Sequence, residues 1–92
     1  MISQLPIEAS VVPNPNKGSF VIKGKTGTTY DATVSYQITS MTGQIVYRSS
    51  GFATNGVIDQ SFALDGNFTS GMYVLIVRCG DQRKNFNFVV EK

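Results

Sequence analysis

Hydrophobic and polar residues alternate along much of the chain with a period of two, which is typical of β-strands. The clearest case is 32–40, where Val34, Tyr36 and Ile38 fall on one face and the polar residues between them on the other. Residues that favour turns, mainly glycine, asparagine and aspartate, separate such stretches. The pattern predicts seven strands, at residues 7–12, 19–23, 32–40, 44–49, 57–64, 72–79 and 83–91.

The number of strands and the spacing of the turns predict an all-β fold. About seven strands with turns roughly every 8–12 residues are typical of an immunoglobulin-like antiparallel β-sandwich, and a small closed barrel is the alternative. The turns at 41–43 and 80–81 each predict a hairpin. Phe68 is expected to plug the loop 65–71, in which a single turn of 3₁₀ helix would fit.

The length of 92 residues predicts a single domain over 1–92, in which residues 1–6 are a linker or an added segment. A domain of this size buries roughly two-thirds of its unfolded surface, which leaves little room for an active site beside the core. Hydrophobic residues make up 41% of the chain and charged residues 15%, which favours a folded domain over a disordered one. The longest apolar run, 72–77, is far shorter than the ~20 residues of a membrane helix, so we expect no direct membrane insertion.

The side chains needed for most chemistry are missing. The chain has no histidine, which excludes the Ser-His-Asp and Cys-His mechanisms and the usual zinc sites. The carboxylates are spread over separate strands and turns, and the basic residues form no stripe that would favour nucleic acid. Cys79 has no partner for an internal disulfide and is interpreted as a buried or half-buried strand residue. We therefore expect no enzyme activity, catalytic residue, metal or cofactor.

The aromatic residues leave one binding function open. Most of them fall at inward positions of the predicted strands, where they would form the core. Phe52 is the exception, because it follows Ser49-Ser50-Gly51 in a predicted loop and is the best candidate for an exposed contact. An adhesive or carbohydrate-binding spacer module of immunoglobulin or fibronectin type III shape is therefore the alternative function, since sandwiches host many functions.

Four motifs occur in a fixed order along the chain. Apolar strands flank a turn rich in proline and asparagine, a strand and turn of mixed polarity follow, then a Gly-x-Tyr step, and an apolar strand ends the chain. They are Pro13-Asn14-Pro15-Asn16-Lys17-Gly18, then 36–47, then Phe68-Thr69-Ser70-Gly71-Met72-Tyr73, and Asn87-Phe88-Val89-Val90-Glu91-Lys92.

In this order and at these spacings, the motifs resemble the C-terminal sorting domain of the type IX secretion system, type A, of the Bacteroidota. The resemblance extends from about residue 7 to residue 92. Two positions depart from the family pattern: Phe68 replaces the usual leucine, and Asn87 stands where the family often has lysine. The first change keeps an apolar side chain, whereas the second removes a charge from the tail.

The resemblance implies a secretion and sorting signal rather than a catalyst. It implies a passenger protein on the N-terminal side, transit through the periplasm, and recognition by the outer-membrane translocon. The cell surface or the medium is the expected destination. In many family members a sortase removes the domain and couples the passenger to a surface lipopolysaccharide.

The turn and the tail are the expected recognition elements. If the last strand lies at a sheet edge, its unpaired backbone groups would let a partner add a strand. A purely structural role for the turn is the alternative, because proline, asparagine and glycine each favour turn conformations. The hypothesis names eleven positions for translocon recognition: Pro13, Asn14, Pro15, Gly18, Gly71, Tyr73, Phe88, Val89, Val90, Glu91 and Lys92.

Overall fold

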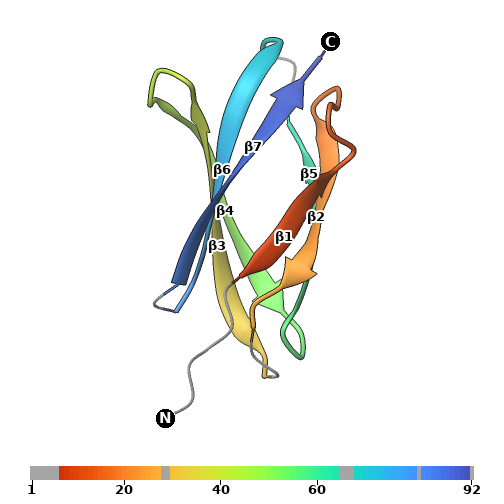
Figure 1. Ribbon diagram of the computed structural model, residues 1–92, viewed down its shortest axis with the longest axis vertical. Coiled ribbons are helices and arrows are strands. Elements are labelled where there is room, and N and C mark those ends of the chain that lie inside the picture. The colour runs from red at the N-terminus through yellow and green to blue at the C-terminus, as the bar shows by residue number, and fades with distance from the viewer. Residues whose placement is uncertain (1–6, 28–29, 65–67, 81, 92) are drawn as a thin grey trace.

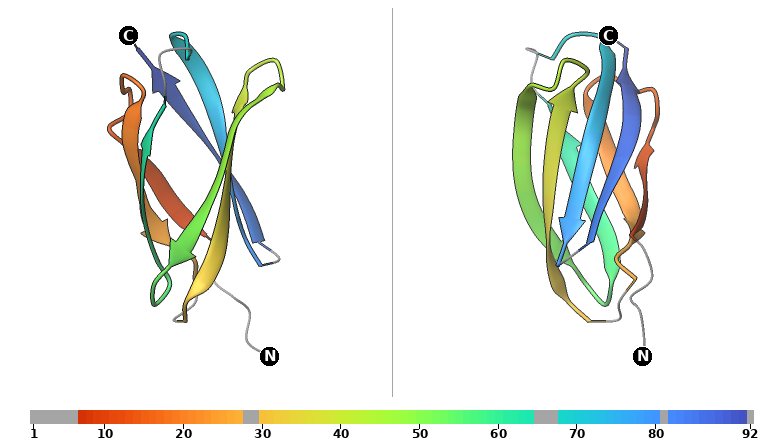
Figure 2. Two further views of the ribbon diagram at one scale, coloured as in Figure 1. Left: turned by 180° about the vertical axis from the view of Figure 1, so that it is seen from behind. Right: turned by 60° about the vertical axis from the view of Figure 1, so that its left-hand side comes forward.

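Seven antiparallel strands form two sheets that face each other (Figures 1 and 2). The computed structural model describes residues 7–27, 30–64, 68–80 and 82–91. The strand order is β1-β2-β5 in one sheet and β4-β3-β6-β7 in the other, which confirms the predicted sandwich. The strands are β1 (Glu8–Val12), β2 (Ser19–Lys25), β3 (Ala32–Ser40), β4 (Ile45–Ala53), β5 (Val57–Ala63), β6 (Gly71–Cys79) and β7 (Gln82–Val90).

The core consists of the inward-facing residues of both sheets, as the period-two pattern predicts. Val34 and Ile38 of β3 are fully buried, and Tyr36 between them is nearly so. The ring of Phe20 packs between Phe62, with ring centres 5.4 Å apart, and Phe88, at 5.0 Å. Residues from β2, β5 and β7 therefore meet at the centre of the molecule, and the two sheets share one hydrophobic core.

Both predicted hairpins are present. At the 41–43 turn the Gly43 amide donates to the Ser40 carbonyl at 2.9 Å, and the Ser40 amide donates to the Gln44 carbonyl at 2.8 Å. Strands β6 and β7 pair from Cys79 and Gln82 onward, although Asp81 of the connecting turn lies outside the described residues. Cys79 is buried in β6, as expected.

The prediction for β4 was too short, and with it the placement of Phe52 in a loop was wrong. The strand continues to Ala53, because every residue of 47–53 pairs with β3, including Phe52 with Thr33. Phe52 is nevertheless exposed, at 75%. The turn that ends β4 comes later, at 54–57, where the amides and carbonyls of Thr54 and Val57 bond each other.

The loop before β6 is only partly described. Phe68 is buried and its ring lies 5.5 Å from that of Tyr73, which confirms its role as a plug. The described residues 68–71 of the loop contain no 3₁₀ turn, and residues 65–67 lie outside the described residues. Within the described residues, no helix is long and apolar enough to span a membrane.

Candidate functional site

The four sequence motifs meet at one end of the sandwich, here called the tail end. It comprises the loop 13–18, the hairpin turn 40–44, the segment 68–73 and the last described residues 88–91. Strand register brings them together, because Tyr73 of β6 lies opposite Ser40 of β3 on one side and Phe88 of β7 on the other. Figures 1 and 2 show these segments at the end where β7 finishes, whereas β1 begins toward the opposite end.

The loop 13–18 is bonded to the outer edge of β7 like a short additional strand. The Asn16 amide donates to the Val89 carbonyl at 3.0 Å, and the Glu91 amide donates to the Asn16 carbonyl at 2.7 Å. A third bond runs from the Val89 amide to the side-chain oxygen Oδ1 of Asn14, at 2.9 Å. The Pro-Asn-Pro turn and the tail are therefore one structural unit, although they lie at opposite ends of the sequence.

Asn16 organises this loop, and the sequence analysis did not single it out. Its side chain is buried, with Nδ2 donating to the Pro13 carbonyl at 3.1 Å and Oδ1 accepting from the Gly18 amide at 2.9 Å. The second bond closes an Asx turn, in which an asparagine caps the backbone two residues later. An asparagine two positions before a glycine was the available signal for this role.

Gly18 ends the loop in a conformation that favours glycine. Its φ is +107°, where a residue with a Cβ atom would be strained. Its carbonyl accepts from the Leu64 amide at 2.7 Å, which ties the loop to the end of β5. Pro13, Asn14 and Pro15 are exposed, and the peptide bonds before both prolines are cis.

The Gly-x-Tyr step anchors the segment before β6. The Tyr73 hydroxyl donates to the Thr69 carbonyl at 2.7 Å, and its ring lies 5.9 Å from that of Phe88. Gly71 is exposed and pairs with Val90. Tyr73 is thus a buried link between the segment 68–71 and the tail strand, and only Gly71 of this motif's two candidate positions reaches the surface.

The tail strand is an edge strand, but its last part is not open. Strand β7 is the outermost strand of its sheet, which confirms the expected edge. The outer backbone groups of Val89, and the amide of Glu91 directly after the strand, already bond the loop 13–18, so the expectation that they are unpaired is wrong. Phe88 and Val90 are fully buried, Val89 is half-buried, and Glu91 is exposed. Lys92 lies outside the described residues.

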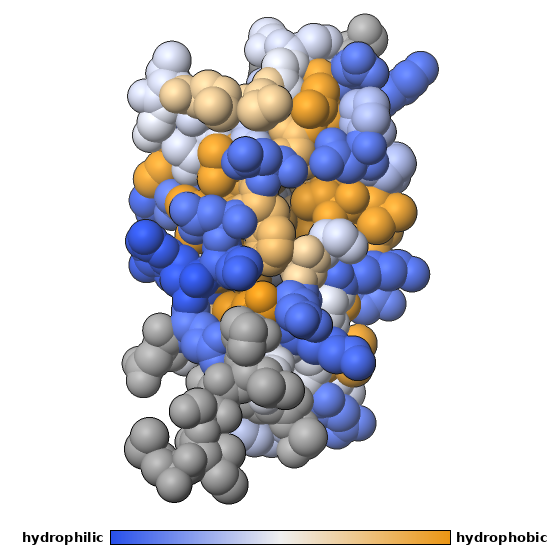
Figure 3. Space-filling model, in the orientation of Figure 1, coloured by the Kyte–Doolittle hydropathy of each residue, from blue (hydrophilic) through white to orange (hydrophobic). Residues whose placement is uncertain are grey.

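The part of this edge that the loop 13–18 does not bond lies farther from the tail end. Backbone groups of an antiparallel edge strand point outward at every second residue. Counting back from Val89, the outward positions are Asn87, Asn85 and Arg83, all exposed. Figure 3 shows polar side chains gathered along this half of β7, with more apolar surface toward the tail end.

A hollow of about 660 Å³ opens at the tail end between the β3–β4 hairpin and the segment 68–73. Its rim includes the exposed apolar residues Ile45 and Val46, and Met41 stands exposed in the adjoining turn. Hydroxyl groups of Thr42 and Thr69 also line it. The hollow presents apolar surface and neutral hydrogen-bonding groups, a combination suited to holding a partner segment rather than to acid–base chemistry.

The comparison with known protein families gives a match that includes all four segments of the tail end. The family model described as the secretion system C-terminal sorting domain matches residues 10–91. The matched stretch contains the loop 13–18, the hairpin turn, the segment 68–73 and the described tail. No curated protein matches the chain.

Proposed function

The chain belongs to the family of secretion system C-terminal sorting domains, and from this premise we propose that its tail end is the surface read by the outer-membrane type IX translocon. The family implies the type IX secretion machinery, a passenger on the N-terminal side, and export to the cell surface or beyond. It is a family of sorting signals and not a class of enzymes.

One observation carries the proposal: four motifs that are distant in the sequence form a single surface at the tail end. Strand β1 begins toward the opposite end, so a passenger joined before it would leave the tail end uncovered (Figure 1). The folded end, rather than an extended peptide, is then what the translocon recognises. Transit through the periplasm and removal by a sortase complete the proposal.

The candidate positions divide into two roles within this surface. The exposed ones would touch the translocon, and the buried ones would hold them in place. The exposed or half-buried positions are Pro13, Asn14, Pro15, Gly71, Val89 and Glu91, and the buried ones are Gly18, Tyr73, Phe88 and Val90.

The test is export of a fluorescent protein that carries a periplasmic signal and ends in residues 1–92. Hosts with and without a working type IX translocon are compared, and surface and medium fluorescence are measured. We expect export only where the translocon works, and loss of export when residues 88–92 are deleted. Fluorescence trapped in the periplasm of both hosts would contradict the sorting role and favour a spacer module.

Deleting the tail also removes the buried Phe88 and Val90, so a second variant separates recognition from folding. Glu91→Lys reverses an exposed charge at the tail end, and Thr33→Lys adds a charge at an exposed position of β3 far from it. Both variants are expected to keep the melting temperature of the parent. Only Glu91→Lys should reduce export, and an equal effect of the two variants would argue against a recognition surface at the tail end.

A further inference from the structure

The two sheets differ in how their charges are arranged. Strands β3, β4, β6 and β7 contain no aspartate or glutamate. Their basic residues are Arg48, Arg78, Arg83 and Lys84. In the other sheet each strand lysine faces an acid across neighbouring strands, with Lys23 opposite Asp59 and Lys25 opposite Glu8. Charge is therefore balanced on the three-stranded sheet and unbalanced on the four-stranded one.

Two of these arginines lie directly opposite each other. Arg78 of β6 and Arg83 of β7 are register partners, and both are exposed. Like charges directly opposite each other on neighbouring strands are destabilising. Nothing in the packing of the described residues requires this pair, because both side chains point away from the core. An arrangement that costs stability without a structural gain indicates a function.

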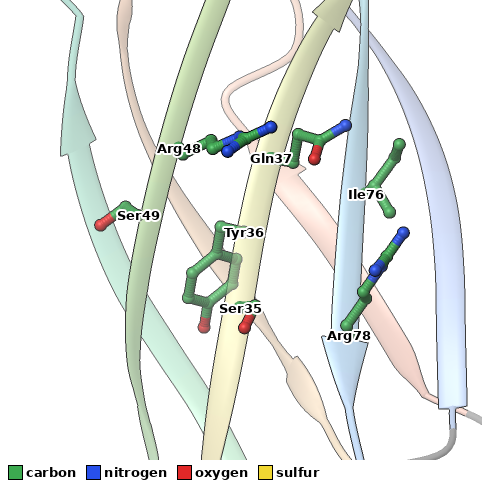
Figure 4. Close-up of a pocket in the computed structure, with 7 residues that line it drawn as sticks. All are labelled: Ser35, Tyr36, Gln37, Arg48, Ser49, Ile76 and Arg78. Carbon is green, nitrogen blue, oxygen red and sulfur yellow. The ribbon is translucent and has the colours of Figure 1, made fainter. Parts of the chain in front are cut away.

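The third arginine lies on the same outward face, beyond β3. Arg48 of β4 is the register partner of Gln37, and Gln37 in turn faces Ile76 of β6. Arg48 and Arg78 both line a hollow of about 390 Å³ together with Ser35 and Gln37. Figure 4 shows Arg48 extending from β4 toward Gln37, and Arg78 extending along β6 toward Ile76.

An exposed aromatic ring extends this face. Phe52 is 75% exposed on β4, and by strand alternation it points to the same side as Ser50 and Arg48. Its ring offers a flat apolar surface in a row of otherwise polar side chains. The apolar face of a sugar ring packs against surfaces of this kind.

We propose that the outward face of the β4-β3-β6-β7 sheet binds an acidic polysaccharide. Arg78 and Arg83 would hold a carboxylate between them through their planar, forked donors, with Arg48 binding a second acid group across the hollow. Ser35 and Gln37 would bond sugar hydroxyls, and Phe52 would stack on a ring. This site lies on a sheet face, distinct from the tail end, and binding there does not depend on the sorting role.

The chemistry of the face favours a polysaccharide over an acidic peptide. A peptide docks on a sheet most readily by adding a strand to an edge, where backbone groups are unpaired. Along the hollow, Ser35 and Gln37 of β3 pair with β4 on one side and β6 on the other, so this part of the face offers side chains rather than unpaired backbone. Neutral hydroxyl and amide groups between the arginines match a ligand that alternates hydroxyls with acid groups.

The experiment is affinity gel electrophoresis of the 92-residue chain through polygalacturonate, with neutral dextran and polyglutamate as comparisons. The variant Arg78→Gln/Arg83→Gln removes the opposed pair, and Lys23→Gln/Lys25→Gln removes the same net charge from the other sheet. We expect retardation by polygalacturonate only, weakened about tenfold or more in the arginine variant and less than about twofold in the lysine variant. Phe52→Ser should also weaken the retardation by polygalacturonate.

Each other outcome overturns the proposal. No retardation excludes the site, and equal weakening in both double variants shows attraction by net charge alone. Retardation by polyglutamate as strong as that by polygalacturonate assigns the face to an acidic polypeptide instead. The melting temperature of the arginine variant controls for folding, and it is expected not to fall, because the change removes a repulsion.

Discussion

At the scale of single residues, Asn16 holds more of the tail end together than any exposed position. Its backbone bonds Val89 of β7 and Glu91 just after that strand, and its buried side chain bonds the loop at Pro13 and Gly18. The sequence indicated a turn here but not which residue organises it. The Asx turn is local and could be predicted from the asparagine and glycine spacing, whereas the bonds to β7 depend on residues more than seventy positions away.

Replacing Asn16 should therefore destabilise the domain. Asn16→Ala removes both side-chain hydrogen bonds and leaves the buried Gly18 amide and the partly buried Pro13 carbonyl without their partners, at a cost of about 1–3 kcal/mol. Denaturant unfolding of the purified chain measures this loss. The neighbouring exposed Lys17→Ala is the control, with an expected change within about 0.5 kcal/mol. Equal stability of the two variants would mean that the loop is not held by the Asn16 side chain.

Tyr36 gives a second prediction, on pH dependence. Its hydroxyl is buried without a hydrogen-bond partner among the described residues. Burial, with a smaller contribution from Cys79, raises the pKa of Tyr36 to about 12. In the unfolded chain a tyrosine has a pKa of about 10. Above about pH 10 the unfolded state therefore loses a proton that the folded state keeps. Stability is thus fully present below pH 10 and falls as the pH rises from about 10 to 12.

The variant Tyr36→Phe isolates this effect. Without the hydroxyl, the part of the stability loss between about pH 10 and 12 that Tyr36 causes, roughly 2 kcal/mol, should disappear. At neutral pH the variant should be as stable as the parent or more so by about 1 kcal/mol, because an unpaired buried polar group is removed. Urea unfolding of both chains at neutral and alkaline pH gives the difference. Parallel pH profiles would show that the Tyr36 hydroxyl is solvated in the folded state.

At the scale of elements, alternation alone predicted where most strands lie but not how far β4 extends. Ser49-Ser50-Gly51 has the composition of a turn, yet all three residues pair with β3. Gly51 lies against the flexible end of the Gln60 side chain on β5, and nothing in its pairing with β3 interrupts the strand. Pairing with a neighbouring strand overrides local propensity in a sheet. The position of Phe52, and with it the face proposed to bind polysaccharide, could therefore not be read from the local sequence.

Strand β1 offers a test at the same scale. Gly24 of β2 lies opposite Ala9, and a Cβ atom on Gly24 would overlap the carbonyl oxygen of Glu8. Gly24→Ala should push β1 away from β2, its neighbour in the sheet, and destabilise the domain by about 2–4 kcal/mol. Hydrogen exchange should show faster exchange for the amides of β1 than for those of β6. Ser10→Ala, at an exposed position of β1, should leave the stability and the exchange of the β1 amides nearly unchanged. If Gly24→Ala also changes neither, the close contact between β1 and β2 is contradicted.

At the scale of the whole molecule, the sequence predicted the class of fold and the order of its motifs, but not their meeting at one end. That convergence follows from the order β4-β3-β6-β7 and from the loop 13–18 crossing to β7. Both are long-range pairings that a local pattern does not encode. The same holds for the opposed arginines, since Arg78 and Arg83 become a pair only when the register of β6 and β7 is known.

The placement of the two ends gives the last prediction. Strand β7 finishes within the tail end, whereas β1 begins toward the other end of the sandwich (Figure 1). A second folded domain joined after residue 92 would crowd the proposed recognition surface, while the same domain joined before residue 1 would not. In a host with a working type IX translocon, we expect the N-terminal fusion to reach the surface and the C-terminal fusion to remain in the periplasm. Both fusions should keep the melting transition of the sorting domain, because neither changes its core. If the C-terminal fusion is exported as well as the N-terminal one, the translocon does not read the tail end, and recognition has to be sought on another surface.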